Sequence, residues 1–265
     1  MTSNDDILSL LSLIPSGADT AFAGLPTYIS RPSSPSSIAI LYIHDILGHT
    51  NLNARNLCDF YSRQLNATVY IPDFFNGSAP KPEEIPAQDF LQFKADHDKH
   101  ITFPSILKVA RELRQKYDRV GVIGYCFGGW SGFALGSSEH KRADGRMLID
   151  CLSVAHPSWL SKEEIDNIAV PVQIIAPEHD SQFNADLKRH ANAAIPTKIV
   201  PYEYCHFEGV VHRFASQPDF SEPTAEEVRK HEHARKSGDG ARERKAFCRA
   251  QRSIVSWMRE WLIEQ

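Results

Sequence analysis

The predicted fold depends on one stretch, Arg119 to Trp130, with the sequence RVGVIGYCFGGW. Residues 120–123 (VGVI) form a short apolar run, typical of a strand that is buried on both faces of a parallel sheet. A Gly-x-Cys-x-Gly pattern follows at 124–128, and residues 130–136 are compatible with a helix. Strand, sharp turn and helix together predict a nucleophile elbow that carries cysteine where serine is better known.

The chemistry predicted for this turn belongs to Cys126. An elbow holds its central residue in a strained conformation, and strand and helix pass so close together that the flanking Gly124 and Gly128 have no room for a side chain. Cys126 would lie at the first turn of the helix, where free N–H groups and the helix dipole favour a thiolate. The alternative is a buried structural cysteine beside a glycine-rich turn.

Length and composition limit what the turn can belong to. The chain has 265 residues, of which 42% are hydrophobic, enough for one sizeable core. We therefore expect a single domain over residues 1–265. A net charge of −4 offers no basic surface for nucleic acid or for an anionic membrane, so a small molecule is the expected partner.

Cysteine usage and the N-terminus predict the compartment. Five scattered cysteines resemble neither a disulfide framework nor a zinc site, so no metal is expected. Residues 7–15 are apolar but follow two aspartates, unlike a signal peptide, and no stretch approaches the length of a membrane span. These features predict a cytoplasmic protein.

Further segments predict alternating strands and helices, and hence a mostly parallel sheet with helices on both faces. The predicted strands are 25–31 (an edge strand), 38–43, 67–72, 147–155, 169–176 and 197–204, and the predicted helices include 51–65, 101–117 and 241–264. Residues 78–97 are rich in proline and charge and predict a surface excursion near the pocket. The apolar stripe of the last helix predicts core packing, with a dimer contact as the alternative, so both monomer and homodimer stay open.

The loops after the strands are where partners of Cys126 are expected, because ligands bind at the carboxyl ends of parallel strands. In this architecture the chain order is nucleophile, acid, histidine. His212 follows the last predicted strand and is the preferred base, with His206 as the alternative, while His156 is expected to line the pocket. The loop at 176–180 offers two carboxylates. Asp180 is preferred as the acid because it lies deeper in the turn, and Glu178 stays open.

Acyl transfer also needs donors that stabilise an oxyanion. In an elbow these are the N–H after the nucleophile, here Phe127, and one N–H from the loop after the early strand, here Ile46. No cofactor is required for this chemistry.

Four motifs together resemble the dienelactone hydrolases, a cysteine-using branch of the α/β-hydrolases. They are GYCFGG at 124–129, DILG at 45–48, PDFFNG at 72–77 and VHRF at 211–214, and the resemblance covers roughly residues 25–265. Pro-Asp-Phe-Phe and His-Pro-Ser elements look like the branch found in fungi and yeast. The resemblance implies an α/β-hydrolase fold in which Cys126 is the nucleophile, His212 the base and Asp180 its orienting acid.

Two positions bear on the substrate implied by the resemblance. Asp45 stands where the bacterial enzymes have a glutamate that contacts the resting thiol, and it is expected to line the pocket with Arg213. The bacterial enzymes hold the substrate carboxylate with arginines, one of them four residues after the histidine, and here that position is Ser216. Dienelactone itself is therefore not the expected substrate.

The resulting hypothesis is an ester or lactone hydrolase with a Cys-His-Asp triad and an acyl-thioester intermediate. Members of this branch are often linked to secondary-metabolite pathways. Two alternatives stay open. One is an acyl-enzyme that isomerises, cyclises or transfers its acyl group, and the other is a non-catalytic small-molecule binder.

Overall fold

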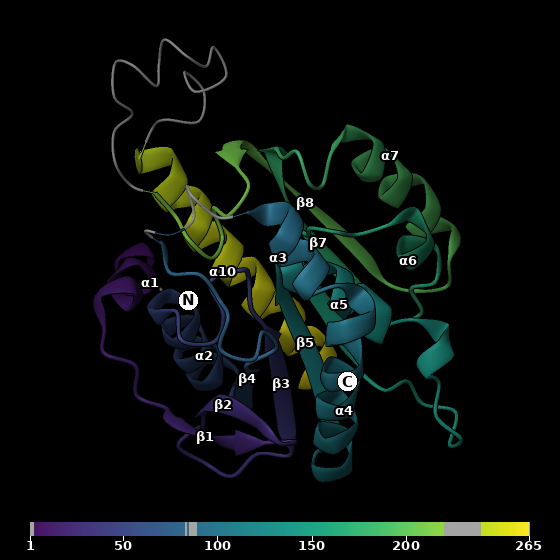
Figure 1. Ribbon diagram of the computed structural model, residues 1–265, viewed down its shortest axis with the longest axis horizontal. Coiled ribbons are helices and arrows are strands. Elements are labelled where there is room, and N and C mark those ends of the chain that lie inside the picture. Colours follow the sequence, from purple (N-terminus) through teal and green to yellow (C-terminus); the bar gives the residue numbers. More distant parts are fainter. Residues whose placement is uncertain (1–2, 83, 85–88, 220–239, 265) are drawn as a thin grey trace.

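A computed structural model of the protein describes residues 3–82, 84, 89–219 and 240–264 (Figure 1). Its centre is an eight-stranded sheet with the order β1-β2-β4-β3-β5-β6-β7-β8. The strands are β1 Ala18–Phe22, β2 Leu25–Ser30, β3 Ile38–Ile43, β4 Thr68–Pro72, β5 Arg119–Tyr125, β6 Cys151–Ala155, β7 Val172–His179 and β8 Tyr202–Val211. From β4 to β8 along the sheet every neighbouring pair is parallel, and only β1 and β2 join antiparallel.

Helices cover both faces of this sheet, as the alternating pattern predicts (Figure 1). They are α1 Asn4–Ser9, α2 Leu52–Leu65, α3 Phe90–Asp96, α4 Lys99–Lys116, α5 Phe127–Leu135, α6 Lys162–Asp166, α7 Ala185–Ala194 and α10 Gly240–Leu262. Short 3₁₀ turns lie at Leu10–Ser12, Ser138–His140 and Ile195–Thr197. None of the helices in the described ranges is both long enough and apolar enough to cross a membrane.

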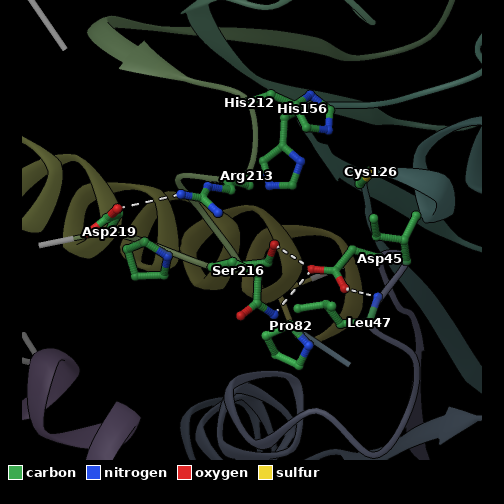
Figure 2. Close-up of a pocket in the computed structure, with 12 residues that line it drawn as sticks. Asp45, Leu47, Pro82, Cys126, His156, His212, Arg213, Ser216 and Asp219 are labelled. Carbon is green, nitrogen blue, oxygen red and sulfur yellow. Dashed lines mark hydrogen bonds and ion pairs between the residues drawn. The ribbon is translucent and has the colours of Figure 1, made fainter. Parts of the chain in front are cut away.

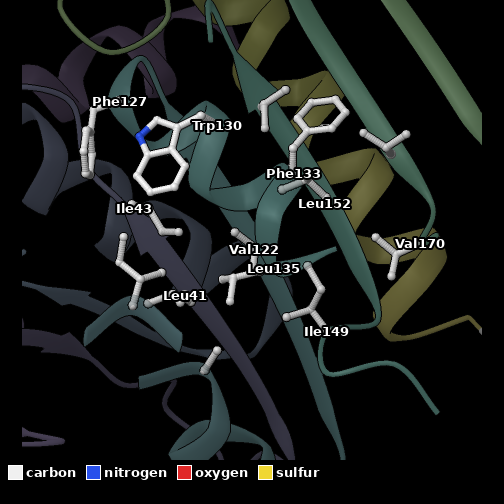
Figure 3. Close-up of a cluster of buried hydrophobic side chains, with 14 of the residues drawn as sticks. Leu41, Ile43, Val122, Phe127, Trp130, Phe133, Leu135, Ile149, Leu152 and Val170 are labelled. Atoms are coloured by element: carbon white, nitrogen blue, oxygen red, sulfur yellow. The ribbon is translucent and has the colours of Figure 1, made fainter. Parts of the chain in front are cut away.

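The two faces have separate hydrophobic cores because side chains alternate along each strand. On β3, Leu41 and Ile43 pack with α3, α4, α5, α6 and α7, whereas Ile40 and Tyr42 pack with α1, α2 and α10. Figure 3 shows the first cluster, in which aromatic side chains of α5 lie against β3 and β6. The core thus holds α5, and with it the turn at Cys126, directly against the central strands.

Several predicted boundaries differ from the structure. The segment at 25–31 was expected at the sheet edge, but β1 pairs with β2 and is itself the edge strand. The last strand was expected to end at residue 204, whereas β8 begins at Tyr202 and continues to Val211. Because β8 is only partly covered, glutamate, histidine and glycine interrupt its apolar residues, and the sequence pattern marks the second half of the strand weakly.

The predicted surface excursion at 78–97 is only partly described, since residues 83 and 85–88 lie outside the described ranges. Its described part contains α3, whose Phe93 is buried in the same cluster as α4 and α5. Pro82 lines the pocket that contains Cys126.

Candidate active site

Cys126 occupies a strained turn between β5 and α5. Its φ is 50° and its ψ is −108°, a conformation that few non-glycine residues adopt. A Cβ on Gly124 would lie 2.2 Å from the carbonyl oxygen of Gly128, and a Cβ on Gly128 would lie 2.2 Å from that of Ile43. Both contacts are with backbone, so glycine is required at both positions. The elbow geometry predicted from the glycines is therefore present.

His212 and Asp180 form a hydrogen-bonded pair beside this turn. Imidazole Nδ1 lies 2.9 Å from Asp180 Oδ2, and the other carboxylate oxygen accepts hydrogen bonds from the backbone N–H groups of Gln182 and Phe183. The Asp180 side chain has no exposed surface, and that of His212 is 26% exposed. The carboxylate is therefore oriented toward the imidazole by its own loop.

Opposite charges set the protonation of this pair. Burial alone would lower the pKa of His212, but the charge of Cys126 and the hydrogen bond with Asp180 raise the pKa to about 10. Burial would raise the pKa of Asp180, yet its bonds to His212 and to the two backbone donors bring the pKa below its ordinary value. At neutral pH the structure thus favours an imidazolium next to a carboxylate.

Ser158 contacts both the sulfur and the imidazole, which the sequence did not predict. Its Oγ is 3.1 Å from Cys126 Sγ and 3.3 Å from His212 Nε2. Its backbone N–H also donates to the carbonyl of Cys126 at 2.8 Å. The available signal was its position in His156-Pro157-Ser158, directly after a strand of the parallel sheet. We call Cys126, Ser158, His212 and Asp180 the thiol network.

Glu178 and His206, the alternative acid and the alternative base, are not part of the thiol network. Glu178 belongs to β7, and its carboxylate accepts a hydrogen bond from the backbone N–H of Gly209 at 2.8 Å. His206 was expected after the last strand, but this placement is wrong, because it lies exposed within β8. The structure pairs Asp180 with His212 instead.

Asp45 has other partners than the thiol. Its Oδ2 accepts hydrogen bonds from Ser216 Oγ at 2.8 Å and from Gln217 Nε2 at 3.3 Å, and its Oδ1 accepts from Leu47 N–H at 3.0 Å (Figure 2). The residue is 6% exposed and lines the pocket. We call these four residues the Asp45 network. It joins the loop after β3 to the segment after His212.

Ile46 and Phe127 are the predicted oxyanion donors. Ile46 lines the pocket, and its N–H donates no hydrogen bond to another group in the described part of the chain. Phe127 is the first residue of α5, where an N–H has no acceptor within the helix. Both N–H groups are thus available to a ligand beside Cys126.

The two remaining predicted residues, His156 and Arg213, differ strongly in exposure. His156 is fully buried, and its ring packs edge-on against that of His212 with centroids 4.8 Å apart. Neither ring nitrogen of His156 has a partner among the described residues, and burial holds its pKa well below the ordinary value, so the ring is neutral. The Arg213 side chain is 57% exposed, and its guanidinium lies 3.6 Å from the Asp219 carboxylate at the pocket mouth (Figure 2).

These groups line one pocket of about 450 Å³, which holds Cys126, His156, His212, Asp45, Ile46 and Arg213. The volume suits a small organic molecule. Within the described ranges, no three His, Cys, Asp or Glu side chains are grouped so that they could hold a metal ion. The chemistry that the pocket offers is that of a thiol and an imidazole that line the same cavity.

Comparisons with known proteins find similar hydrolases in fungi. Hydrolase tropI from Talaromyces stipitatus is 29% identical over 263 residues, covering 95% of this chain and 92% of that protein. Hydrolase pyvD from Aspergillus violaceofuscus is 29% identical over 209 residues, covering 77% of this chain and 81% of that protein.

A solved structure and a family profile extend the comparison. The putative dienelactone hydrolase from Klebsiella pneumoniae superposes with a TM-score of 0.65 at 15% identity, covering 89% of this chain and 93% of that one, which confirms the predicted α/β-hydrolase fold. The profile of the dienelactone hydrolase family matches residues 25–262. The chain therefore belongs to the dienelactone hydrolase family, and it is a carboxylic ester or lactone hydrolase.

Proposed function

We propose that the protein hydrolyses an ester or lactone through a Cys126-His212-Asp180 triad and an acyl-thioester intermediate. The observation that carries this proposal is the thiol network, in which the buried Asp180 carboxylate contacts the His212 imidazole, and Ser158 contacts both that imidazole and the Cys126 thiol, which line the pocket. A nucleophile, its base and the group that orients the base are the parts that acyl transfer requires.

In the first half of the reaction the Cys126 thiolate attacks the substrate carbonyl. The N–H groups of Ile46 and Phe127 hold the oxyanion, and each such donor contributes on the order of 3 kcal/mol to transition-state stabilisation. The C–O bond to the leaving group then breaks, and His212 gives its proton to the departing alcohol oxygen. A thioester on Cys126 remains.

In the second half of the reaction water replaces the alcohol. His212, now neutral, takes a proton from a water molecule that attacks the thioester carbonyl, and the C–S bond breaks to release the acid and the thiolate. Asp180 keeps the imidazole in the tautomer with Nε2 toward the reacting atoms.

The Asp45 network supports a neutral substrate. Ser216 stands where bacterial relatives are expected to have an arginine for the substrate carboxylate, and its hydroxyl donates to the Asp45 carboxylate. A substrate carboxylate would therefore face a negative charge instead of a guanidinium. We propose an uncharged ester or lactone as the substrate, with a product of secondary metabolism as the favoured source.

The test is Cys126→Ala, assayed with small aryl esters and lactones. Loss of the nucleophile is expected to lower kcat by at least about 10³-fold while the thermal midpoint changes little. Cys205→Ala is the matched control, because that thiol lies on β8 and hydrogen-bonds Glu203 and Ser253 away from the pocket. Hydrolysis that persists in Cys126→Ala would contradict the proposal.

A second measurement follows the intermediate itself. Quenched turnover followed by peptide mapping is expected to find the acyl group on Cys126, and labelled water is expected to deliver its oxygen into the acid product. Isomerisation or transfer would leave the label out of the product.

A further inference from the structure

Ser158 is held at the thiol by a constrained segment of backbone. His156 and Trp159, on either side of Pro157-Ser158, have φ values of 38° and 57°. Pro157 packs against the elbow so closely that a Cβ on Gly129 would lie 2.3 Å from the proline Cβ. The chain thus adopts an unfavourable conformation that brings this hydroxyl to the sulfur.

The hydroxyl contacts both members of the nucleophile pair. It is 3.1 Å from Cys126 Sγ and 3.3 Å from His212 Nε2, and Ser158 is only 4% exposed. A serine hydroxyl has one proton to donate and two lone pairs that accept. It can therefore donate to one of these neighbours while it accepts from the other.

We propose that Ser158 is a further catalytic residue, which stabilises the Cys126 thiolate and relays the thiol proton to His212. The proposal rests on the proposed role of Cys126 as the nucleophile. The proposal gives the Ser158 hydroxyl a role that the triad does not include. The contact of this hydroxyl with the reacting sulfur supports the proposal.

The relay conserves atoms and charge. In the neutral state Cys126 Sγ–H donates to Ser158 Oγ, whose own hydrogen points at His212 Nε2. The S–H and O–H bonds break while a new O–H bond and an Nε2–H bond form, so the serine is unchanged and a thiolate faces an imidazolium. The hydroxyl then turns and donates to the sulfur while it accepts from Nε2–H.

The surroundings favour the charged arrangement. Asp180 accepts from the other nitrogen of His212, and the neutral ring of His156 packs against the same imidazole. The other titratable groups that face the pair from the pocket are Asp45, Arg213 and Asp219. Substitutions at Ser158 leave all of these charges in place.

The test measures alkylation of Cys126 by iodoacetamide as a function of pH, which reports the thiolate without turnover. Peptide mapping separates Cys126 from the other thiols. Ser158→Ala is expected to move the midpoint of the acid limb upward by about one pH unit and to lower kcat/KM by about 10-fold. Ser153→Ala is the matched control, because that buried hydroxyl of β6 donates to Gln173 and is expected to leave both values unchanged.

A second pair of variants separates the hydroxyl from packing. Threonine and valine have nearly the same shape, so Ser158→Thr and Ser158→Val disturb the segment equally and differ in the hydroxyl alone. Ser158→Thr is expected to keep the wild-type midpoint, and Ser158→Val is expected to shift it as alanine does. This pair also decides the matter if Ser158→Ala fails to fold.

Two outcomes would overturn the inference: a wild-type midpoint in both Ala and Val variants, or equal shifts in Thr and Val. Failure of the proposed function shows differently, as hydrolysis that survives Cys126→Ala. The alkylation profile does not depend on turnover, so the two failures are distinguishable.

Discussion

Two buried carboxylates, Asp180 and Asp45, have different effects: Asp45 lines the pocket, whereas Asp180 lies behind His212 and contacts its Nδ1. Asp180 faces an imidazole and raises its pKa, whereas Asp45 faces a serine hydroxyl, an amide and a backbone N–H. Of these partners only the imidazole gains and loses a proton between about pH 4 and pH 11. The comparison teaches that the partner decides the role of each carboxylate, so the thiol network supplies reactivity and the Asp45 network supplies selectivity.

The largest effect that tests this difference is expected from Asp180→Asn. The charge of Cys126 and the hydrogen bond with Asp180 together raise the pKa of His212 to about 10, so removal of the carboxylate lowers that pKa, and the alkaline limb of kcat/KM moves to lower pH. We also expect kcat/KM to fall by about 10³-fold, because the imidazole loses its orienting group. Glu178→Gln, on β7 and two residues before Asp180, is the control and is expected to keep the alkaline limb of the wild type. If the alkaline limb of kcat/KM stays at the wild-type pH in Asp180→Asn, the proposed difference in role between Asp180 and Asp45 is contradicted.

A smaller effect is expected when the turn between the two networks is distorted. In Gly128→Ala the new methyl group meets the backbone oxygen of Ile43, so we expect about 3 kcal/mol of lost unfolding free energy. In Gly132→Ala, on the same helix, the methyl group meets the end of the Leu152 side chain, and the cost is expected to stay within about 1 kcal/mol. Urea denaturation measures both, and equal midpoints would contradict the expectation.

Asp45→Asn tests the proposed role of the second carboxylate in substrate selectivity. Removal of this negative charge is expected to raise kcat/KM for a carboxylate-bearing ester relative to its neutral analogue by about 5-fold, or about 1 kcal/mol. The alkaline limb set by His212 is expected to stay where it is. A shift of that limb would show that Asp45 belongs to the thiol network after all.

The smallest effect is expected from Arg213→Ala. This guanidinium is exposed and pairs with Asp219 across 3.6 Å, a geometry that contributes at most about 1 kcal/mol in water. We expect kcat/KM for neutral esters to change by less than about 2-fold, measured beside Asp45→Asn on the same substrates. A larger loss of kcat/KM would show that Arg213 contacts the substrate.

The sequence predicted the parts of this site that follow from strand order. Cys126, Asp180 and His212 each follow a strand of the parallel sheet, and parallel strands deliver their carboxyl ends to one edge, so pattern alone placed them together. Glycines at 124 and 128 predicted the elbow because only steric exclusion explains them at that spacing.

The parts that the sequence did not predict depend on side-chain directions. Ser158 reaches the thiol because of positive φ values at His156 and Trp159, which no periodicity records. The hydrogen bond of Asp45 to Ser216 joins residues 171 positions apart. The sequence did not predict the full length of β8, because polar residues and a glycine interrupt the apolar pattern of this partly exposed edge strand. The same error misplaced His206.

Seven non-glycine residues of the described chain have positive φ, and four of them, Cys126, His156, Trp159 and Arg213, belong to the pocket or border it. Each such conformation costs about 1–3 kcal/mol, which the remaining scaffold must offset. Thermal robustness and turnover therefore oppose each other in this enzyme. A screen that selects for thermal stability alone would enrich glycine at these positions. At position 126 the most stable variants would be catalytically inactive.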